Sequence, residues 1–288
     1  MRALVTGGVG FVGTNLIKRL LRDGYEVISI DNYSTGYTEN EQDGCHYIHA
    51  GVQDMKFWGR RLEKQDMTPD IIFHLAALAR IQPSIKEPYP AIETNFNGTL
   101  NILEYARNNN IPVIYAGSSS FHHGLYGSPY AWSKYGGEEL CKLYSRVYDL
   151  NTSICRFYNV YGDYMITEGD YATVVAIFQR QYENGESLTI TGDGEQRRDF
   201  THVDDIVDGL IKCVGKDFRG DIFELGKGEN FSINEVADMF NWNKTYIPAR
   251  PGEYDKTLCD YSRAKLELGW EPEKDLPTYV AKWLEENE

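Results

Sequence analysis

Cysteine, positive charge and long apolar runs are all scarce in this sequence. Its five cysteines are odd in number, widely separated and without CxxC spacing, so we expect reduced core residues, as in a cytoplasmic protein. The net charge of −14 argues against binding to nucleic acid or to an anionic membrane. The apolar runs stop well short of the roughly 20 residues that span a bilayer. Because the first predicted strand begins at residue 3, we also expect no signal peptide.

The remaining composition, 42% hydrophobic and 25% charged in 288 residues, is typical of a globular enzyme. Apolar runs alternate with amphipathic stretches up to about residue 160, which predicts an α/β fold with a Rossmann-type doubly wound parallel sheet. Beyond Gly162 shorter elements favour a smaller α/β lid domain. We therefore predict a Rossmann domain over residues 1–162, open to later segments, and a substrate-binding domain over 163–288. After a strand at 3–5, we expect strands at 25–30, 47–49, 71–75, 113–116 and 152–155, and helices at about 14–23, 91–108 and 131–148.

A glycine-rich turn follows the first strand, with Gly7, Gly10 and Gly13 ahead of an amphipathic helix. Glycine permits the tight turn and lets a pyrophosphate approach the N–H groups at the helix N-terminus. The second strand ends at Asp31, about 20 residues later, where a carboxylate suits both hydroxyls of an adenosine ribose and repels a 2′-phosphate. Three glycines alone are a weak signal. Between a strand and a helix, and with Asp31 at this distance, they predict a dinucleotide site that prefers NAD to NADP.

A second motif follows the strand at 113–116. It consists of the serines at 118–120 and then Tyr130 and Lys134, which lie four residues apart and share one face of a helix. An ammonium beside a phenol favours the phenolate, so Tyr130 can take a proton from a substrate hydroxyl while hydride passes to a nicotinamide. A serine from the neighbouring strand end can bond to the same oxygen. The alternative, an incidental surface pair, is disfavoured by the dinucleotide pattern upstream.

Together these motifs resemble the extended short-chain dehydrogenase/reductase family. The resemblance covers nearly the whole chain and includes His-Leu-Ala-Ala at 74–77, Asn95, Arg-Phe-Tyr-Asn-Val-Tyr-Gly at 156–162, Arg-Asp-Phe at 198–200, Val-Asp-Asp at 203–205 and Arg-Pro-Gly at 250–252. Within that family the chain is most similar to NAD-dependent nucleotide-sugar 4-epimerases that act on UDP-hexoses, whose second-strand loop is similar to residues 31–36. The resemblance implies NAD as cofactor, a UDP-hexose as substrate, and a homodimer in which helices 91–108 and 131–148 pack as a four-helix bundle.

The resemblance also implies roles at the matching positions. The catalytic residues would be Ser119, Tyr130 and Lys134, of which Lys134 would also bond to the nicotinamide ribose. The cofactor-binding residues would be Gly7, Gly10, Phe11, Val12 and Gly13 at the pyrophosphate, Asp31, Asn32, Thr35 and Gly36 at the adenosine ribose, and Leu75, Ala76, Ala77, Ala79, Asn95 and Tyr158 elsewhere. The substrate-binding residues would be Ser119, Ser120, Tyr130, Asn159, Val174, Arg198, Arg250 and Thr257. Arginines suit a diphosphate in an acidic protein because the guanidinium fork matches phosphate oxygens.

Several alternatives stay open. Counting back along the motif without a gap places the catalytic hydroxyl at Ser119, and a local gap would move it to Ser120. No acidic pair follows, which a 4,6-dehydratase would need to expel water, so an epimerase is favoured. In the epimerases that the chain resembles, a small residue at the position of Thr257 goes with acceptance of a C2 acetamido group, so the resemblance favours UDP-GlcNAc and UDP-GalNAc, alone or alongside UDP-Glc and UDP-Gal. UDP-glucuronate, or a non-catalytic nucleotide-sugar or NAD binder, remains an alternative. His122 and His123 lack further ligands at metal spacing, so we expect no metal site.

Overall fold

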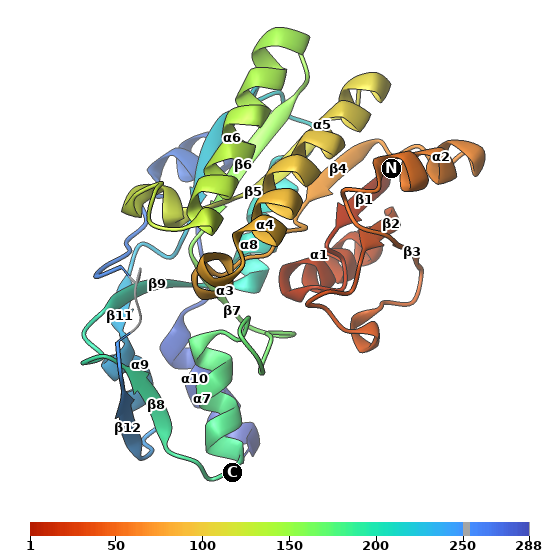
Figure 1. The fold of residues 1–288 in the computed structure, drawn as a ribbon. Helices are drawn as coiled ribbons and strands as arrows, with labels where there is room; N and C mark the ends of the chain where they lie inside the picture. The colour runs from red at the N-terminus through yellow and green to blue at the C-terminus, as the bar shows by residue number, and fades with distance from the viewer. Residues whose placement is uncertain (250–253, 288) are drawn as a thin grey trace.

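The computed structural model describes residues 1–249 and 254–287, and its largest unit is a seven-stranded parallel sheet (Figure 1). The strands lie in the order β10-β6-β5-β4-β1-β2-β3. They are mostly apolar runs that are buried on both faces, as a parallel sheet covered by helices requires. The predicted doubly wound α/β fold is thus confirmed. The strands span Arg2–Thr6 (β1), Glu26–Asp31 (β2), Cys45–His49 (β3), Ile71–His74 (β4), Val113–Ser118 (β5), Thr152–Phe157 (β6) and Asp221–Leu225 (β10).

Helices cover both faces of this sheet. One face packs against α2, α5 and α6, which bury Trp58, Ile102 and Cys141 there. The opposite face packs against α1 and α8, which bury Leu16 and Ile206. These apolar contacts hold the strands in one rigid layer. The helices span Phe11–Arg22 (α1), Met55–Lys64 (α2), Gly98–Asn109 (α5), Pro129–Tyr148 (α6) and Val203–Lys212 (α8).

The order in which successive strands are added to the sheet reverses at β1. β1 pairs with β2 on one side and with β4 on the other. Such a reversal leaves a crevice beyond the carboxyl ends of the strands, where open α/β sheets bind their ligands. Thr6, Asp31, His74 and Ser118 are the last residues of β1, β2, β4 and β5. The fold therefore gathers the polar residues of the two sequence motifs at one edge.

A second unit follows, with its own core of Phe178, Phe240 and neighbouring apolar residues. It contains the small sheets β11-β9-β7 and β12-β8 and lies at one end of the molecule (Figure 1). The intervening β10 is an edge strand of the large sheet and α8 packs on that sheet, so the chain returns to the first unit before it completes the second. The second unit spans Asn159–Tyr161 (β7), Val174–Glu183 (α7), Leu188–Thr191 (β8), Arg197–His202 (β9), Asn230–Ser232 (β11), Ile233–Met239 (α9), Lys244–Ile247 (β12) and Leu276–Asn287 (α10).

The structure departs from the expected helices in two ways: one expected helix is divided, and two helices were not expected. The helix expected at 91–108 is divided into α4 (Pro88–Ile92), a π-helical turn at Glu93–Asn97, and α5. The sequence also did not predict α2 or a short α3 (Ile81–Lys86). α2 buries only Trp58, Gly59 and Leu62, so its sequence has too few apolar residues at helical spacing to predict a helix. Within the described ranges, no helix is long and apolar enough to cross a membrane.

Candidate active site

The turn after β1 is packed against the loop that follows β4. Gly7 has a φ of +75°, and a Cβ there would lie 2.9 Å from the backbone nitrogen of Ala76. A Cβ at Gly13 would lie 2.0 Å from the carbonyl oxygen of Gly7. Gly10 is the N-cap of α1, which opens with Phe11 and Val12. The turn therefore has no room for side chains at Gly7 and Gly13. The free N–H groups of the helix N-terminus suit a pyrophosphate.

Asp31 is held at the end of β2, beside this turn. Its Oδ2 accepts the N–H of Val9 at 3.1 Å and its Oδ1 accepts the N–H of Tyr33 at 2.8 Å. Burial raises the pKa of Asp31, and the two backbone bonds oppose that rise. The loop that follows carries the other predicted ribose-side residues, Asn32, Thr35 and Gly36. It lies against the turn, because a Cβ at Gly36 would be 2.4 Å from the carbonyl oxygen of Val9.

A buried polar chain that the sequence did not predict fixes the loop after β4. Thr6 Oγ1 accepts the N–H groups of Leu75 and Ala76 at 3.2 and 3.1 Å. It also lies 2.7 Å from Nδ1 of His74, whose Nε2 is 2.9 Å from Thr99 Oγ1. Because Thr6 already accepts two N–H groups, it donates to Nδ1, and His74 carries its proton on Nε2. Burial lowers the pKa of His74 to about 3, which keeps the imidazole neutral.

Asn95 fastens the same loop to α6. This fully buried side chain accepts the N–H of Leu78 at 2.8 Å and donates to the carbonyl of Leu78 at 3.2 Å. It also donates to Ser133 Oγ at 3.1 Å. The π-helical turn around Asn95 is a feature that recurs at functional sites. Asn95 thereby positions the segment that carries four predicted cofactor residues, Leu75, Ala76, Ala77 and Ala79.

Tyr130 lies at the start of α6 and meets the end of β5. Its hydroxyl donates to Ser118 Oγ at 3.1 Å, and Ser118 Oγ also accepts the N–H of Ser120 at 3.2 Å. The hydroxyl in contact with Tyr130 thus belongs to Ser118, one position before the predicted Ser119. β5 extends through Ser118, whereas Ser119 begins a 3₁₀ turn and is half-buried. Burial raises the pKa of Tyr130, and the Ser118 bond opposes the rise.

Lys134 follows Tyr130 by one helical turn and is buried. Its ammonium lies 4.3 Å from the centre of the Tyr115 ring, where a cation–π contact stabilises it. Tyr115 in turn donates its hydroxyl to the carbonyl of Lys134 at 3.2 Å. Burial lowers the pKa of Lys134 to about 8, although Glu138 opposes that shift. The ammonium therefore points toward β5, the strand that carries Tyr115.

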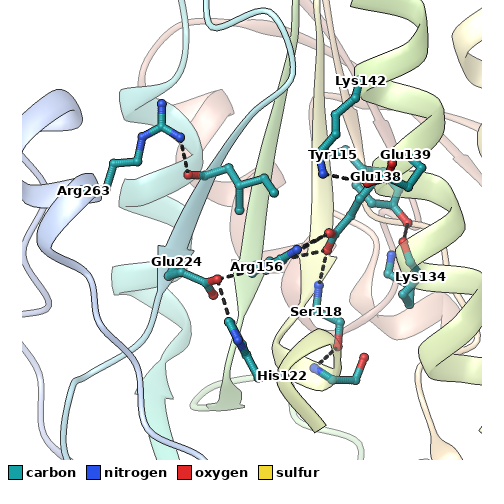
Figure 2. Close-up of polar contacts among 12 residues, drawn as sticks. Tyr115, Ser118, His122, Lys134, Glu138, Glu139, Lys142, Arg156, Glu224 and Arg263 are labelled. Carbon is teal, nitrogen blue, oxygen red and sulfur yellow. Dashed lines mark hydrogen bonds and ion pairs between the residues drawn. The ribbon is translucent and has the colours of Figure 1, made fainter. Parts of the chain in front are cut away.

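A buried ion network supports the Ser118 end of the site (Figure 2). Arg156 bonds to Glu138 at 2.6 Å and to Glu224 at 3.0 Å, and its guanidinium lies 3.7 Å from the centre of the Phe121 ring. His122 Nε2 is 2.8 Å from the same Glu224. Although burial raises the pKa of Glu224, His122 and Arg156 hold it below its usual value. The sequence analysis did not assign Glu138 or Glu224, because Glu138 approaches Ser118, and Glu224 approaches Arg156, only in the folded chain.

Apart from Ser119, Ser120 and Tyr130, the predicted substrate residues that the structure describes lie in or against the second unit. Arg198 is buried and donates to the carbonyl of Tyr254 at 2.6 Å. Thr257 is also buried, and its hydroxyl accepts the N–H of Asp199 at 2.9 Å. This hydrogen bond joins the Thr257 side chain to β9. His123 stacks on Tyr254 at 4.3 Å. Asn159 and Val174 are half-buried and are the first residues of β7 and α7. Tyr158, a predicted cofactor residue, is buried and precedes β7. Arg250 lies outside the described residues.

The residues present fit a bound dinucleotide. The glycine turn would receive the pyrophosphate on the free N–H groups at the N-terminus of α1, where Gly7 and Gly13 are packed too closely against other backbone to carry side chains. The Asp31 carboxylate would accept the ribose hydroxyls beside the turn. Such a group supplies hydride transfer, and the Tyr130–Ser118 pair supplies a proton acceptor at the same edge of the sheet. The arrangement can therefore oxidise a secondary alcohol and reduce the resulting ketone.

Comparison with known proteins agrees with this geometry along the whole chain. A model of the NAD dependent epimerase/dehydratase family matches residues 3–226. The UDP-glucose 4-epimerase of Mycolicibacterium smegmatis is 32% identical, over 99% of this chain and 98% of that relative. The UDP-glucose 4-epimerase of Thermotoga maritima, solved with UDP-glucose, has a TM-score of 0.93 at 30% identity and covers 99% of both chains. A Thermus thermophilus UDP-glucose 4-epimerase, solved with NAD, has a TM-score of 0.90 at 26% identity, over 100% of this chain and 99% of that one.

Proposed function

Because the chain belongs to the NAD dependent epimerase/dehydratase family, we propose that it catalyses the 4-epimerisation of a UDP-hexose. The family and the NAD cofactor that the sequence predicts are both confirmed. The observation that carries the proposal is the hydrogen bond of 3.1 Å between Tyr130 and Ser118, at the strand edge that also carries the glycine turn and Asp31. The glycine turn and Asp31 would hold NAD, which would supply reversible hydride transfer at C4 of the sugar.

Tyr130 is the proton acceptor in this reaction. Its phenolic oxygen takes the proton of the C4 hydroxyl as the ketone forms, and Ser118 orients that oxygen through their shared hydrogen bond. The 4-keto sugar then turns over in the pocket, and Tyr130 returns the proton when the opposite face is reduced. Lys134, on the next turn of α6, would bond to the nicotinamide ribose. No reductant is consumed, because oxidation and reduction cancel within one turnover.

The carboxylates near the site favour epimerisation over dehydration. Loss of water from C6 would need a carboxylic acid close to the sugar. Glu138 accepts three hydrogen bonds from Arg156, and Glu224 is shared between Arg156 and His122. Ser119 and Ser120, which follow Ser118, are not acidic. Neither glutamate is therefore poised to donate a proton to a leaving hydroxyl.

The second unit would hold the nucleotide end of the substrate. Arg198 and Asn159 lie on neighbouring strands of one small sheet, and Arg250 would add a further cation for the diphosphate. We assign this role to the parts of residues 163–288 that form the second unit, together with Asn159. Thr257 is the residue whose size favours acceptance of a C2 acetamido group. The substrates proposed are therefore UDP-GlcNAc and UDP-GalNAc, alone or alongside UDP-Glc and UDP-Gal.

A homodimer is proposed from an apolar stripe on α6. Trp132, Leu143 and Val147 are 39%, 49% and 59% exposed, and their spacing places them on one face of the helix. The same face would pack against its copy, together with α5. Light scattering after size exclusion should give twice the chain mass, and Leu143→Glu should lower it toward the monomer. A monomer mass for the unaltered protein would contradict the dimer.

Proton NMR with UDP-GlcNAc, and separately with UDP-Glc, tests the activity. No reductant is added, and the anomeric signals are followed. We expect the C4 epimer to appear and the same ratio to be reached from either epimer. A 4-keto-6-deoxy product would contradict the proposal and indicate a dehydratase. No reaction with either sugar, by a protein with bound NAD, would also contradict it and direct the assay to UDP-glucuronate.

A further inference from the structure

His122 lies in the 3₁₀ turn Ser119–His123 that follows β5, and the proposed mechanism gives it no role. Its Nε2 lies 2.8 Å from Oε1 of Glu224, and the same oxygen accepts a bond from Arg156 at 3.0 Å (Figure 2). Glu224 comes from β10, the edge strand beside β6. His122 therefore joins the far end of the turn to the large sheet.

The near end of the turn contacts the same ion network. Glu138 accepts three hydrogen bonds from Arg156, and its Oε1 also accepts the N–H of Ser118 at 3.5 Å. A Cβ at Gly117 would lie 2.8 Å from that oxygen and 3.0 Å from Cγ of Arg156. Glycine at 117 therefore lets the carboxylate and the guanidinium lie directly against the end of β5.

The middle of the turn packs on the network through Phe121. The Arg156 guanidinium lies 3.7 Å from the centre of the Phe121 ring, and the Tyr135 ring of α6 lies 5.6 Å from it on centres. The rings of Phe121 and His122 meet edge to face at 5.2 Å. The turn is thus held at three successive points, at Ser118, Phe121 and His122.

Three successive serines at 118–120 provide a hydroxyl whichever of them ends β5. Because side chains alternate between the two faces of a strand, a slip of one residue would put Ser119 where Ser118 now lies. Ser118 Oγ bonds to the Tyr130 phenol at 3.1 Å and to the N–H of Ser120 at 3.2 Å. Neither bond requires residue 118 in particular, because a serine also stands at 119. The choice of serine therefore depends on contacts further along the turn.

We propose that His122 is a positioning residue that, through its bond to Glu224, fixes the turn so that Ser118 and not Ser119 meets Tyr130. A slip of one residue would separate His122 from Glu224 and would move Phe121 away from the guanidinium. The inference rests on the proposed function in one respect, since Ser118 and Tyr130 act there on the C4 hydroxyl. The His122 side chain is 41% exposed, so its replacement removes this contact without opening the core.

Crystal structures of the NAD-bound variants without substrate provide the first test. In His122→Leu, the contact of 3.1 Å between Tyr130 and Ser118 should be lost or should be shared between two positions of the turn. His122→Gln keeps a donor toward Glu224 and should retain the contact. Arg263→Met is the matched control, because it removes an exposed ion pair with Asp221 on the same β10 and should leave the turn unchanged.

Turnover of the UDP-hexose provides the second test, as a double-mutant cycle. His122→Leu should lower kcat about 3–10-fold through misplacement of the serine hydroxyl, with KM and NAD affinity within about twofold of the unaltered protein. Because His122 acts through Ser118, the double variant His122→Leu, Ser118→Ala should be no slower than Ser118→Ala alone. His122→Gln should restore most of kcat, and Arg263→Met should leave kcat unchanged.

An unchanged contact between Tyr130 and Ser118 in folded His122→Leu would overturn the proposal. Losses of kcat that multiply in the double variant would also overturn it, as would a rise in KM alone, which would make His122 a ligand of the substrate. Near-ultraviolet circular dichroism checks the fold. Should His122→Leu not fold, Glu224→Leu removes the same bond from the other side and should give the same results. Because the crystal structures need no substrate, absence of epimerisation would contradict the proposed function and leave the test of His122 intact.

Discussion

Replacement of Arg156 by methionine should destabilise the protein more than any loss of an exposed cation. The Arg156 and Glu138 side chains are 4% and 1% exposed and their bond is 2.6 Å. Removing the guanidinium leaves Glu138 buried without its counter-charge and Glu224 with only His122, which costs about 3–5 kcal/mol of unfolding free energy. Loss of the cation–π contact with Phe121 adds about 0.5–2 kcal/mol.

The assay is urea unfolding at pH 7, with Lys142→Met as the matched control. Lys142 bonds to Glu139 on the same helix at 2.7 Å, but these side chains are 25% and 46% exposed, so its loss should cost only about 0–1 kcal/mol (Figure 2). In the double variant Glu138→Gln, Arg156→Met, part of the stability should return because the orphaned charge is gone. A cost below 1 kcal/mol for Arg156→Met, equal to that of Lys142→Met, would refute the reasoning.

Three further predictions follow from the site. The pKa of His74 is about 3 in the folded protein and 6.5 unfolded, so the unfolded chain binds more protons as pH falls below 6.5 and wild-type stability drops. The stability deficit of His74→Gln in urea unfolding should therefore shrink by about 2 kcal/mol between pH 8 and pH 5, whereas a constant deficit would contradict a buried neutral imidazole. Gly7→Ala should weaken NAD binding at least about tenfold by calorimetry, because its Cβ would meet Ala76, while Gly24→Ala, also at positive φ but in open space, should keep NAD affinity. Ser118→Ala should lower kcat by about 10–100-fold and Ser119→Ala far less, and the reverse order would return the catalytic role to Ser119.

The features that the sequence predicts best are those set by neighbours along the chain. The alternation of apolar runs and amphipathic stretches predicts the parallel sheet, and the glycine spacing with Asp31 predicts the dinucleotide turn. The structure adds why Gly7 is required, since its Cβ would collide with Ala76 from a distant loop. The strand order, in contrast, depends on tertiary pairing that no local pattern encodes.

Counting positions could not predict which of the three serines contacts Tyr130. A motif count places the catalytic hydroxyl at Ser119, but the end of β5 decides which side chain faces α6. The strand continues to Ser118, which therefore meets Tyr130. The contact between Glu224 and Arg156 could not be predicted from the sequence for a similar reason. It comes from β10, the edge strand beside β6, and approaches Arg156 only after a long return of the chain.

The fate of the C4 hydrogen tests the central claim most directly. The enzyme is incubated in D₂O with UDP-GlcNAc or UDP-Glc labelled with deuterium at C4, and separately with unlabelled sugar, and the epimers are examined by NMR and mass spectrometry. If hydride leaves C4 and returns to it within one active site, the epimer from labelled sugar keeps its deuterium and the epimer from unlabelled sugar gains none. Exchange of the C4 hydrogen with solvent, or products altered at C6 instead of C4, would contradict the account.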